Sequence, residues 1–322
     1  MKSPKNILIL VCFISFPLLL VASNSEDRVE KDHVELRDSF NEDIIYPPII
    51  ISPSIEKANA EASYSPDVFQ SVPLFNAHSH NDYKNLNPLL SALNHGFMSI
   101  EVDVHLIDRE LYVSHLRPIL PNKNNTLSKL YLIPLFEMFM QGKGKIVPYT
   151  DQPITLMIDI KSEGSETYNL LKEIIKPYQK MISHWKGNNM FPSAVNLMIS
   201  GNRPIEEILL APIRYVQIDG RLEDLGKNYP TELMPVISID FSKICTRHFF
   251  SKKASKKKME NLHLIADVVH AENKRFRLWK IPEDELVWSI MLKQGVDIIN
   301  ADNIPMLAFF LRKYNLSDLA SN

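Results

Sequence analysis

The chain from residue 72 onward alternates short apolar runs with stretches in which apolar residues recur at helical spacing. The apolar runs are rich in β-branched and aromatic side chains, which is typical of buried strands. Eight such runs are found, at Pro73–Ala77, Met98–Val104, Ile154–Ile160, Val195–Ile199, Arg214–Ile218, Pro235–Asp240, Arg275–Trp279 and Val296–Asn300. The amphipathic stretches predict helices at Pro88–Asn94, Thr167–Trp185, Lys257–Asn273, Glu283–Gln294 and Ile304–Tyr314. The stretches after residues 199 and 218 have a weaker pattern and predict only short turns.

Strands that alternate with helices favour a parallel sheet. Eight strands of this kind over about 245 residues predict a (β/α)₈ TIM barrel that occupies residues 72–322. An open, doubly wound sheet is the alternative. That alternative lacks support, because no glycine-rich nucleotide loop follows any of the strands and the whole chain holds only 9 glycines.

The N-terminus has the pattern of a secretory signal. Lys2 and Lys5 precede the apolar run Ile7–Ala22, and the small residue Ser23 follows. The run is about sixteen residues long, whereas a membrane-spanning helix needs roughly 20. We therefore predict that residues 1–23 are a cleaved signal peptide and that the protein is secreted or resides in the secretory pathway. An uncleaved signal anchor is the alternative.

Residues 24–71 differ in composition from the rest of the chain. Ser25–Asp43 is dense in charge, and Tyr46–Asp67 is rich in proline, serine and alanine. This composition predicts a flexible leader. The alternative is an arm packed on the barrel, since five isoleucines between residues 44 and 51 could be buried.

The composition narrows the class of protein. Hydrophobic residues make up 45% and charged residues 23% of the 322 residues, which is typical of a globular protein. The net charge of −2 argues against a nucleic-acid binder driven by overall charge. Only two cysteines occur, Cys12 and Cys245, which excludes a disulfide scaffold and a cysteine-rich zinc site. Acceptor triplets for N-linked glycans at Asn124 and Asn315 agree with a secretory route.

Histidines and carboxylates gather at the ends of the first two predicted strands. The segment Asn76–Tyr83 brings His78 and His80 directly after the first strand. In the second strand, Glu101 and Asp103 point to one face because side chains alternate along a strand. In a barrel that acidic face would turn inward near the carboxyl end, where barrel enzymes have their active sites.

Carboxylates at this place need a partner, because two unpaired buried charges would be costly. A hard divalent cation, Mg²⁺ or Ca²⁺, suits carboxylate oxygens. On the third predicted strand, Asp159 and Lys161 share one face by the same alternation. Asp159 could be a third metal ligand, and Lys161 could hold a phosphate oxygen of a substrate.

A further histidine, His115, ends the strand-like run Leu111–His115. Histidine titrates near neutral pH and can pass a proton in either direction. Two histidines beside a metal-bound phosphate could cleave a phosphodiester bond. One would remove the proton from the attacking oxygen and the other would protonate the leaving oxygen, while the cation neutralises phosphoryl charge.

Together these motifs resemble the superfamily of glycerophosphodiester phosphodiesterases and phosphatidylinositol-phospholipase-C-like barrels. The similar stretches are His78, Ile100–Val104, Tyr112–His115, Asp159–Lys161, Arg277–Trp279 and Gly295–Asp302. The run from His78 to Tyr83 resembles, more narrowly, the branch that contains the fungal altered inheritance of mitochondria protein 6 and its bacterial relatives. The resemblance implies a barrel of the phospholipase-C-like type and a metal-dependent phosphodiesterase. It implies His78 and His115 as acid and base, with Glu101, Asp103 and Asp159 around the metal.

The sequence departs from the superfamily at three places. The His-Arg-Gly opening is replaced by His78-Ser79-His80, so the phosphate-binding arginine is absent there. Either His78 or His80 could be the catalytic histidine that follows the first strand. His78 is favoured, because it follows Asn76-Ala77 at the predicted strand end. Asn81-Asp82-Tyr83 stands where the superfamily has Glu-Asn-Thr, and Asp159 replaces a glutamate. These changes bear on substrate specificity more than on the metal site.

Each candidate also has a structural interpretation. Glu101 and Asp103 could form an inward ion pair with Lys161 that merely fills the barrel. The histidines after the first strand could be hydrogen-bonded core residues, and His115 could be an exposed loop residue. Asp159 could cap a loop.

Three other residues near the same strand ends are less specific. Trp279 could form a wall of the pocket that binds substrate, or it could be a core aromatic residue. His105 is expected to be structural, because it lies beyond the end of its predicted strand. Asp302 is expected to be a turn residue or to support another side chain.

We therefore predict a metal-dependent phosphoric diester hydrolase that acts on a glycerophosphodiester or a phospholipid head group. One alternative is a phospholipase D-like enzyme that acts on sphingomyelin or lysophospholipids, which a wide apolar rim around the pocket would favour. The other is a non-catalytic barrel that serves as a secreted binding protein, since a fold does not secure an activity.

Predicted partners follow from the same features. The substrate is expected to be a small molecule or a lipid, and nucleic acid is not expected. The five lysines between residues 252 and 258 could contact an anionic membrane surface, although such runs are often solvated helix starts. The sequence does not define an oligomeric state.

Overall fold

The computed structural model describes residues 72–187, 189–244 and 255–321. Within these residues, eight parallel strands form the centre of the molecule. They are β1 (Leu74–Ser79), β2 (Phe97–Ile107), β4 (Ile154–Ile160), β7 (Val195–Gly201), β9 (Val216–Gly220), β10 (Val236–Asp240), β11 (Arg275–Trp279) and β12 (Ile298–Ala301). All eight coincide with runs that the sequence predicts as strands.

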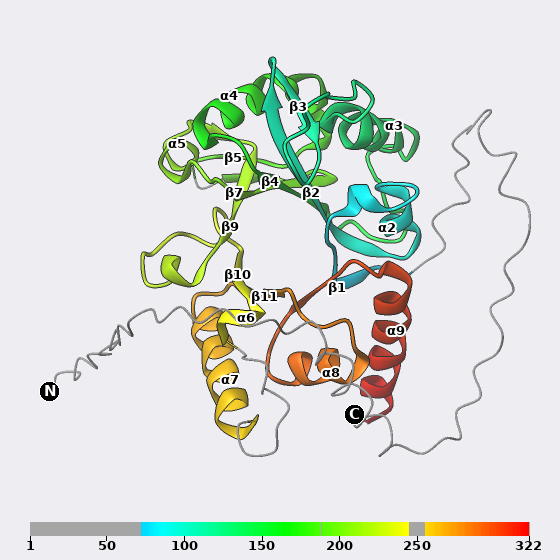
Figure 1. Cartoon of the computed structure of the whole chain (residues 1–322), viewed down its shortest axis with the longest axis vertical. Helices are drawn as coiled ribbons and strands as arrows, with labels where there is room; N and C mark the ends of the chain where they lie inside the picture. The colour runs from blue at the N-terminus through cyan, green and yellow to red at the C-terminus, as the bar shows by residue number, and fades with distance from the viewer. Residues whose placement is uncertain (1–71, 188, 245–254, 322) are drawn as a thin grey trace, which may run out of the picture. The chain divides into compact units, whose positions relative to one another are not determined.

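The strands close into a barrel (Figure 1). The order is β1-β12-β11-β10-β9-β7-β4-β2, and β1 pairs in turn with β2. The closed parallel sheet with helices around it confirms the predicted (β/α)₈ barrel and rules out the open doubly wound sheet.

Alternation along the strands separates an apolar layer from a polar interior. On β2, Ile100, Val102 and Val104 are fully buried in the core between sheet and helices. Glu101 and Asp103 alternate with them and turn into the barrel, as the period of two requires. Inside the barrel, residues nearer the amino ends of the strands form an apolar cluster of Met157, Met198, Val236 and Ile298.

Helices surround the strands on the outside of the barrel. They are α2 (Leu90–Asn94), α3 (Ile133–Gln141), α4 (Gly164–Ile174), α5 (Ile205–Leu209), α6 (Phe241–Ile244), α7 (Ser255–Ala271), α8 (Glu285–Lys293) and α9 (Ile304–Ser321). Short single-turn helices lie at Asp82–Lys84, Ser128–Leu132, Lys176–Met181 and Leu222–Asp224. None of the helices in the described part of the chain is long and apolar enough to cross a bilayer.

The structure differs from the predicted elements at several places. The single helix predicted over Thr167–Trp185 is wrong. Instead α4 ends at Ile174, a 3₁₀ turn that contains Pro177 follows, and Trp185 lies in the short strand β5 (His184–Lys186). Pro177 explains the break, because proline has no N–H with which to continue an α-helix.

Two small sheet elements extend the barrel. The strand-like run near His115 is β3 (Glu110–Val113), which pairs antiparallel with the outer part of β2. The other element is a sheet that the sequence did not predict, made of β5, β6 (Asn189–Phe191) and β8 (Ile213–Arg214). Residues 1–71, Cys245 and two lysines of the lysine run, Lys252 and Lys253, lie outside the described residues. The predictions that rest on them stay untested.

Candidate active site

A cavity of about 850 Å³ lies at the carboxyl ends of the strands. Its lining includes all three candidate carboxylates, Glu101, Asp103 and Asp159. It also includes His80 and His115. The cavity therefore gathers side chains from β2 and β4 with residues that follow β1 and β3, as a barrel mouth allows.

The three carboxylates form one cluster. Asp103 and Asp159 are direct neighbours across the β2–β4 pairing. One oxygen from each carboxylate, Glu101 included, lies within 4.8 Å of the others. The backbone N–H of Asn81 donates to Glu101 Oε2 at 2.6 Å, which ties the loop after β1 to the cluster.

Lys161 lies against two of the carboxylates. Its Nζ is 3.0 Å from Asp103 Oδ1 and 2.9 Å from Asp159 Oδ2. The ion pair that the structural interpretation expected is therefore present, between Lys161 and Asp103 and Asp159. Glu101 is not part of it. The positive charge balances part of the acidic cluster.

The cluster could hold a divalent cation. Asp159 Oδ1 is buried and has no hydrogen-bond partner, which leaves a carboxylate oxygen free for a ligand. Three carboxylates with one such oxygen are the donor set that hard cations take. The residues present therefore fit Mg²⁺ or Ca²⁺, and the choice between the two is open.

Burial controls the protonation of the cluster. Desolvation raises the pKa of Glu101 well above its ordinary value, and the negative charge of Asp103 adds to the effect. Burial also acts to raise the pKa of Asp103, but hydrogen bonds with Glu101, His115 and Lys161 outweigh it and lower that pKa. Of the two neighbouring carboxyl groups, Glu101 therefore takes up a proton more readily than Asp103.

Two histidines reach the cavity, and each is paired with a carboxylate. His115 Nδ1 lies 2.8 Å from Asp103 Oδ2. His80 Nδ1 lies 2.8 Å from Asp302 Oδ1, and this hydrogen bond lowers the pKa of Asp302. A pairing at Nδ1 orients each ring, and Nε2 of His80 also lies 3.4 Å from Asn81 Nδ2.

His78 does not reach the cavity. Its side chain is fully buried, is not part of the cavity lining, and has Nδ1 2.7 Å from Ser99 Oγ. Burial lowers the pKa of His78 well below its ordinary value, so the ring is neutral. The geometry favours His80, rather than the His78 that the sequence favoured, as the histidine that can contact a substrate.

Trp279 lies where the sequence placed it, whereas His105, which was expected beyond the end of its strand, lies within β2. Trp279 lines the cavity, and Lys280 Nζ stacks 4.7 Å above its ring. His105 is buried beside the site, with Nε2 3.4 Å from the carbonyl oxygen of His115.

Tyr83 is a site residue that sequence reasoning missed. Its hydroxyl donates to Asp103 Oδ2 at 2.8 Å and also lies 2.8 Å from Asn81 Oδ1. Burial, followed by the hydrogen bond to Asp103, raises the pKa of Tyr83, so the hydroxyl keeps its proton and remains a donor. Its position directly after the two histidines was the available signal.

The neighbouring Asp82 has a structural role. It is fully buried and accepts hydrogen bonds from the Ser79 hydroxyl at 2.8 Å, the Tyr131 hydroxyl at 3.0 Å and the backbone N–H of Leu89. Leu89 has a φ of 65°, which is strained for a residue with a side chain. Asp82 therefore holds the loop after β1 in place.

A buried arginine lies at the floor of the cavity. Arg277 Nη1 donates to Asp219 Oδ2 at 3.2 Å and to Ser238 Oγ at 2.9 Å, and Nε donates to Asn300 Oδ1 at 2.8 Å. Both Arg277 and Asp219 line the cavity. The sequence motif around Trp279 drew attention to this strand, but it did not indicate the partner on β9.

Comparisons with known proteins find similar sequences. Residues 66–218 match the family model of the AIM6-like phosphodiesterase domain. Altered inheritance of mitochondria protein 6 from Eremothecium gossypii is 27% identical over 271 residues, which cover 74% of this chain and 69% of that protein. The homolog from Arthroderma benhamiae is 27% identical over 271 residues, covering 75% of this chain and 85% of its own length. The Saccharomyces cerevisiae protein is 26% identical over 331 residues, covering 88% and 82%.

Two solved structures are also similar. A glycerophosphodiester phosphodiesterase from Parabacteroides distasonis has a TM-score of 0.46 at 14% identity and covers 74% of this chain and 98% of its own. One from Agrobacterium tumefaciens has a TM-score of 0.41 at 13% identity and covers 74% and 99%. The relationship itself comes from the sequence matches. Residues 66–218 of this chain are similar to the AIM6-like phosphodiesterase domain, and this similarity confirms the resemblance that the motifs indicated.

Proposed function

We propose that this protein is a metal-dependent phosphoric diester hydrolase that acts on a glycerophosphodiester or a phospholipid head group. The observation that carries the proposal is the contact between His115 and Asp103, 2.8 Å apart within the acidic cluster. That contact brings a proton carrier and a set of metal ligands into one cavity. Such a combination suits a reaction in which charge and protons move together on a phosphoryl group.

Glu101, Asp103 and Asp159 would hold the cation. When bound, a divalent cation supplies positive charge that offsets the charge developing on the phosphoryl oxygens. Lys161, beside Asp103 and Asp159, would hold a non-bridging phosphate oxygen as a point charge. Trp279 would form one wall for the remainder of the substrate.

His80 and His115 would move the protons. One ring takes the proton from the attacking oxygen as the new P–O bond forms, and the other donates a proton to the leaving oxygen as the old P–O bond breaks. Asp302 and Asp103 hold the two rings through Nδ1. If water attacks, the product is a phosphomonoester; if a neighbouring hydroxyl of the substrate attacks, a cyclic phosphate forms first.

The test is hydrolysis of bis-p-nitrophenyl phosphate with and without a chelator. We expect chelation to abolish turnover, and we expect Glu101→Ala and His115→Ala each to reduce kcat by about 10²-fold or more. His80→Ala should behave like His115→Ala, whereas His78→Ala should lose stability more than chemistry. His263→Ala, an exposed histidine on α7, is the matched control and should retain full activity. Unchanged turnover in both Glu101→Ala and His115→Ala would contradict the proposed site.

A second candidate is a phospholipase D-like enzyme for sphingomyelin or lysophospholipids. The observation in its favour is a set of exposed aliphatic side chains on loops at the cavity end of the barrel, Leu86, Leu116, Ile119 and Leu120. Product analysis separates the two candidates, because phospholipase D chemistry frees an alcohol head group. The non-catalytic alternative has less support, since it expects the histidines to lie far from the carboxylates.

We also propose that the protein acts outside the cell or in the secretory pathway, on the strength of its first 23 residues. The exposed side chain of Asn124 suits a glycan acceptor.

A further inference from the structure

A loop beside the cavity exposes an unusual amount of apolar surface. The segment of residues 114–125, here called the rim loop, follows β3. Leu116 is 76% exposed, Ile119 is 95% exposed and Leu120 is 90% exposed. Single exposed aliphatic residues are common on soluble proteins, but three within five positions of one loop form a concentrated apolar tip.

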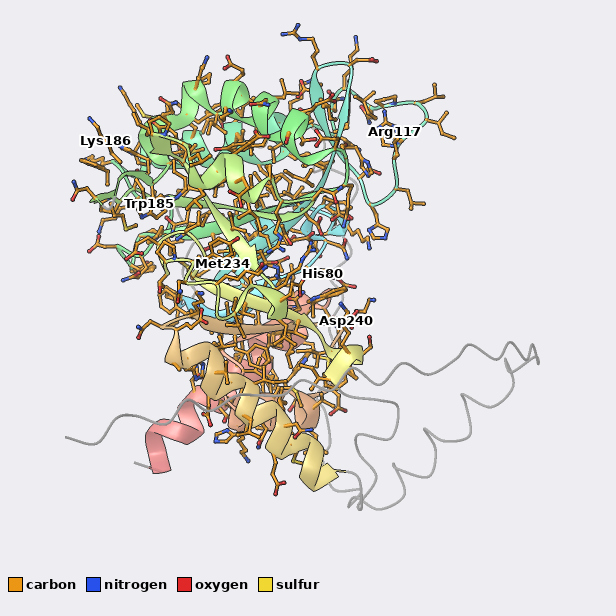
Figure 2. The ribbon with its side chains drawn as sticks, turned by 90° about the vertical axis from the view of Figure 1, so that its left-hand side faces the viewer. His80, Arg117, Trp185, Lys186, Met234 and Asp240 are labelled. Atoms are coloured by element: carbon orange, nitrogen blue, oxygen red, sulfur yellow. The ribbon has the colours of Figure 1, made fainter. Side chains whose placement is uncertain are left out.

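The rim loop lies at the cavity end of the barrel. It begins beside His115, which contacts Asp103 inside the cavity. Figure 2 shows Arg117 on the same side of the barrel as His80 and Asp240, whereas Trp185 and Lys186 lie on the opposite side. A surface that receives the tip of the rim loop would therefore face the mouth of the cavity.

The base of the rim loop is held by the barrel. The backbone N–H of Val113 donates to the carbonyl of Asn125 at 2.9 Å, and that of Ser114 donates to the carbonyl of Asp103 at 3.2 Å. The Ser114 hydroxyl donates to the carbonyl of Leu116 at 2.6 Å. The exposed side chains are thus projected from a fixed base, so their exposure is a property of the fold.

The charged side chains of the rim loop are all basic. Arg117 lies between Leu116 and Ile119, Lys123 follows the apolar tip, and residues 114–125 contain no aspartate or glutamate. Apolar side chains next to cations match the interface of an anionic bilayer, where aliphatic groups enter the acyl boundary and cations meet phosphate groups.

We propose that the rim loop docks this protein on anionic lipid bilayers. Leu116, Ile119 and Leu120 enter the bilayer interface, and Arg117 and Lys123 contact the lipid phosphates. Leu86, on the loop after β1 at the same end of the barrel, adds a second apolar contact. Docking in this way turns the cavity toward lipid head groups. That last consequence rests on the proposed function, whereas the docking itself does not.

The test places an environment-sensitive fluorophore on the rim loop of the full chain. Leu120→Cys is labelled in a background where Cys12→Ser and Cys245→Ser remove the native thiols. With vesicles of phosphatidylcholine and phosphatidylserine we expect a blue shift of the label. With phosphatidylcholine alone we expect a weaker response. The readout reports the loop itself, so binding through the apolar N-terminal run does not imitate it. Protein made in a bacterium keeps Asn124 free of a glycan.

Variants of the full chain measure the contribution of the loop to sedimentation with the same vesicles. We expect Leu116→Ser/Ile119→Ser/Leu120→Ser to weaken partitioning by about tenfold or more. Arg117→Gln and Lys123→Gln should each weaken it by about fivefold. The matched control, Leu210→Ser/Leu264→Ser/Phe309→Ser, removes exposed apolar side chains from three helices and should bind like the wild type.

Several outcomes separate the claims. A label on residue 120 that stays in water while the chain sediments with vesicles would overturn the docking proposal. Equal partitioning of the loop variant and the wild type would also overturn it. Asp103→Ala should abolish hydrolysis but leave vesicle binding unchanged, so failure of the proposed function and failure of the docking proposal give different results.

Discussion

Asp103 connects most of the residues in the proposed site. One of its oxygens contacts His115 and Tyr83, and the other contacts Lys161. A carboxylate held from three directions has little freedom to rotate. The same contacts therefore position Asp103 both as a proposed metal ligand and as the partner of His115. Side chains that orient metal ligands often matter nearly as much as the ligands themselves.

Tyr83→Phe tests this positioning. Phenylalanine keeps the ring but removes the proton donor to Asp103, so we expect a loss of about 10-fold to 100-fold in kcat or in apparent cation affinity. A titration of the activity with Mg²⁺ or Ca²⁺ separates the two effects. Tyr149→Phe, at an exposed position outside the cavity, should change neither quantity. Wild-type values in Tyr83→Phe would show that Asp103 needs no help from the hydroxyl.

The choice between His78 and His80 shows what the sequence could not give. Alternation places Asn76, His78 and His80 on the same inward face of β1, so the sequence could identify the face. Depth along the barrel axis depends on the stagger between neighbouring strands. The sequence ended the first strand at Ala77, but β1 continues to Ser79, and His78 is consequently paired with Asn300 inside the barrel. His80 is the first inward-facing residue beyond the end of β1.

The barrel strands are the elements that the sequence predicted best. Each is buried by helices on the outside, so it appears in the sequence as a short run rich in apolar residues. The sheet of β5, β6 and β8 was missed because its strands have two or three residues each, too few for a periodic pattern. Helix α3 was also missed. Helix α3 has Pro134 in its first turn and directly follows an irregular turn at Ser128–Leu132. Both features obscure the helical pattern in the sequence.

The end of β7 controls the shape of the acidic cluster. Gly201 has a φ of 69°, and a Cβ there would lie 2.1 Å from Asp159 Oδ1 and 2.4 Å from the carbonyl of Ile160. A side chain at residue 201 would displace the carboxylate that the cluster presents. This contact was not predictable from the sequence, because it joins two different strands.

Gly201→Ala is therefore expected to lower both activity and stability. We expect a loss of about 1–3 kcal/mol in the free energy of unfolding, from strain and the displaced Asp159. The loss of activity should exceed what the lower stability explains. Gly226→Ala is the control, since Gly226 has a φ of 78° but nothing within 4 Å of an added Cβ. Chemical denaturation and hydrolysis assays measure the two effects. Equal behaviour of the two variants would show that Asp159 is insensitive to this contact.

At the scale of the whole molecule, the proposed cation links the strands of the barrel. A ligand that binds only the folded state stabilises it, by about 2.7 kcal/mol at a free concentration one hundred times its Kd. For a domain of this size, that corresponds to a rise of about 5–10 °C in Tm. We expect Mg²⁺ or Ca²⁺ to raise the Tm of the wild type, and a chelator to reverse the rise. Glu101→Ala should show no such rise, and the same increase in that variant would place the cation elsewhere.

Lys161 already sits between Asp103 and Asp159, and this has a consequence for assembly. The Lys161 ammonium group offsets negative charge of the two carboxylates, so the barrel can fold before a metal binds. A newly made chain could therefore fold without a metal. It could bind the proposed cation later, when the Lys161 side chain moves away from the two carboxylates.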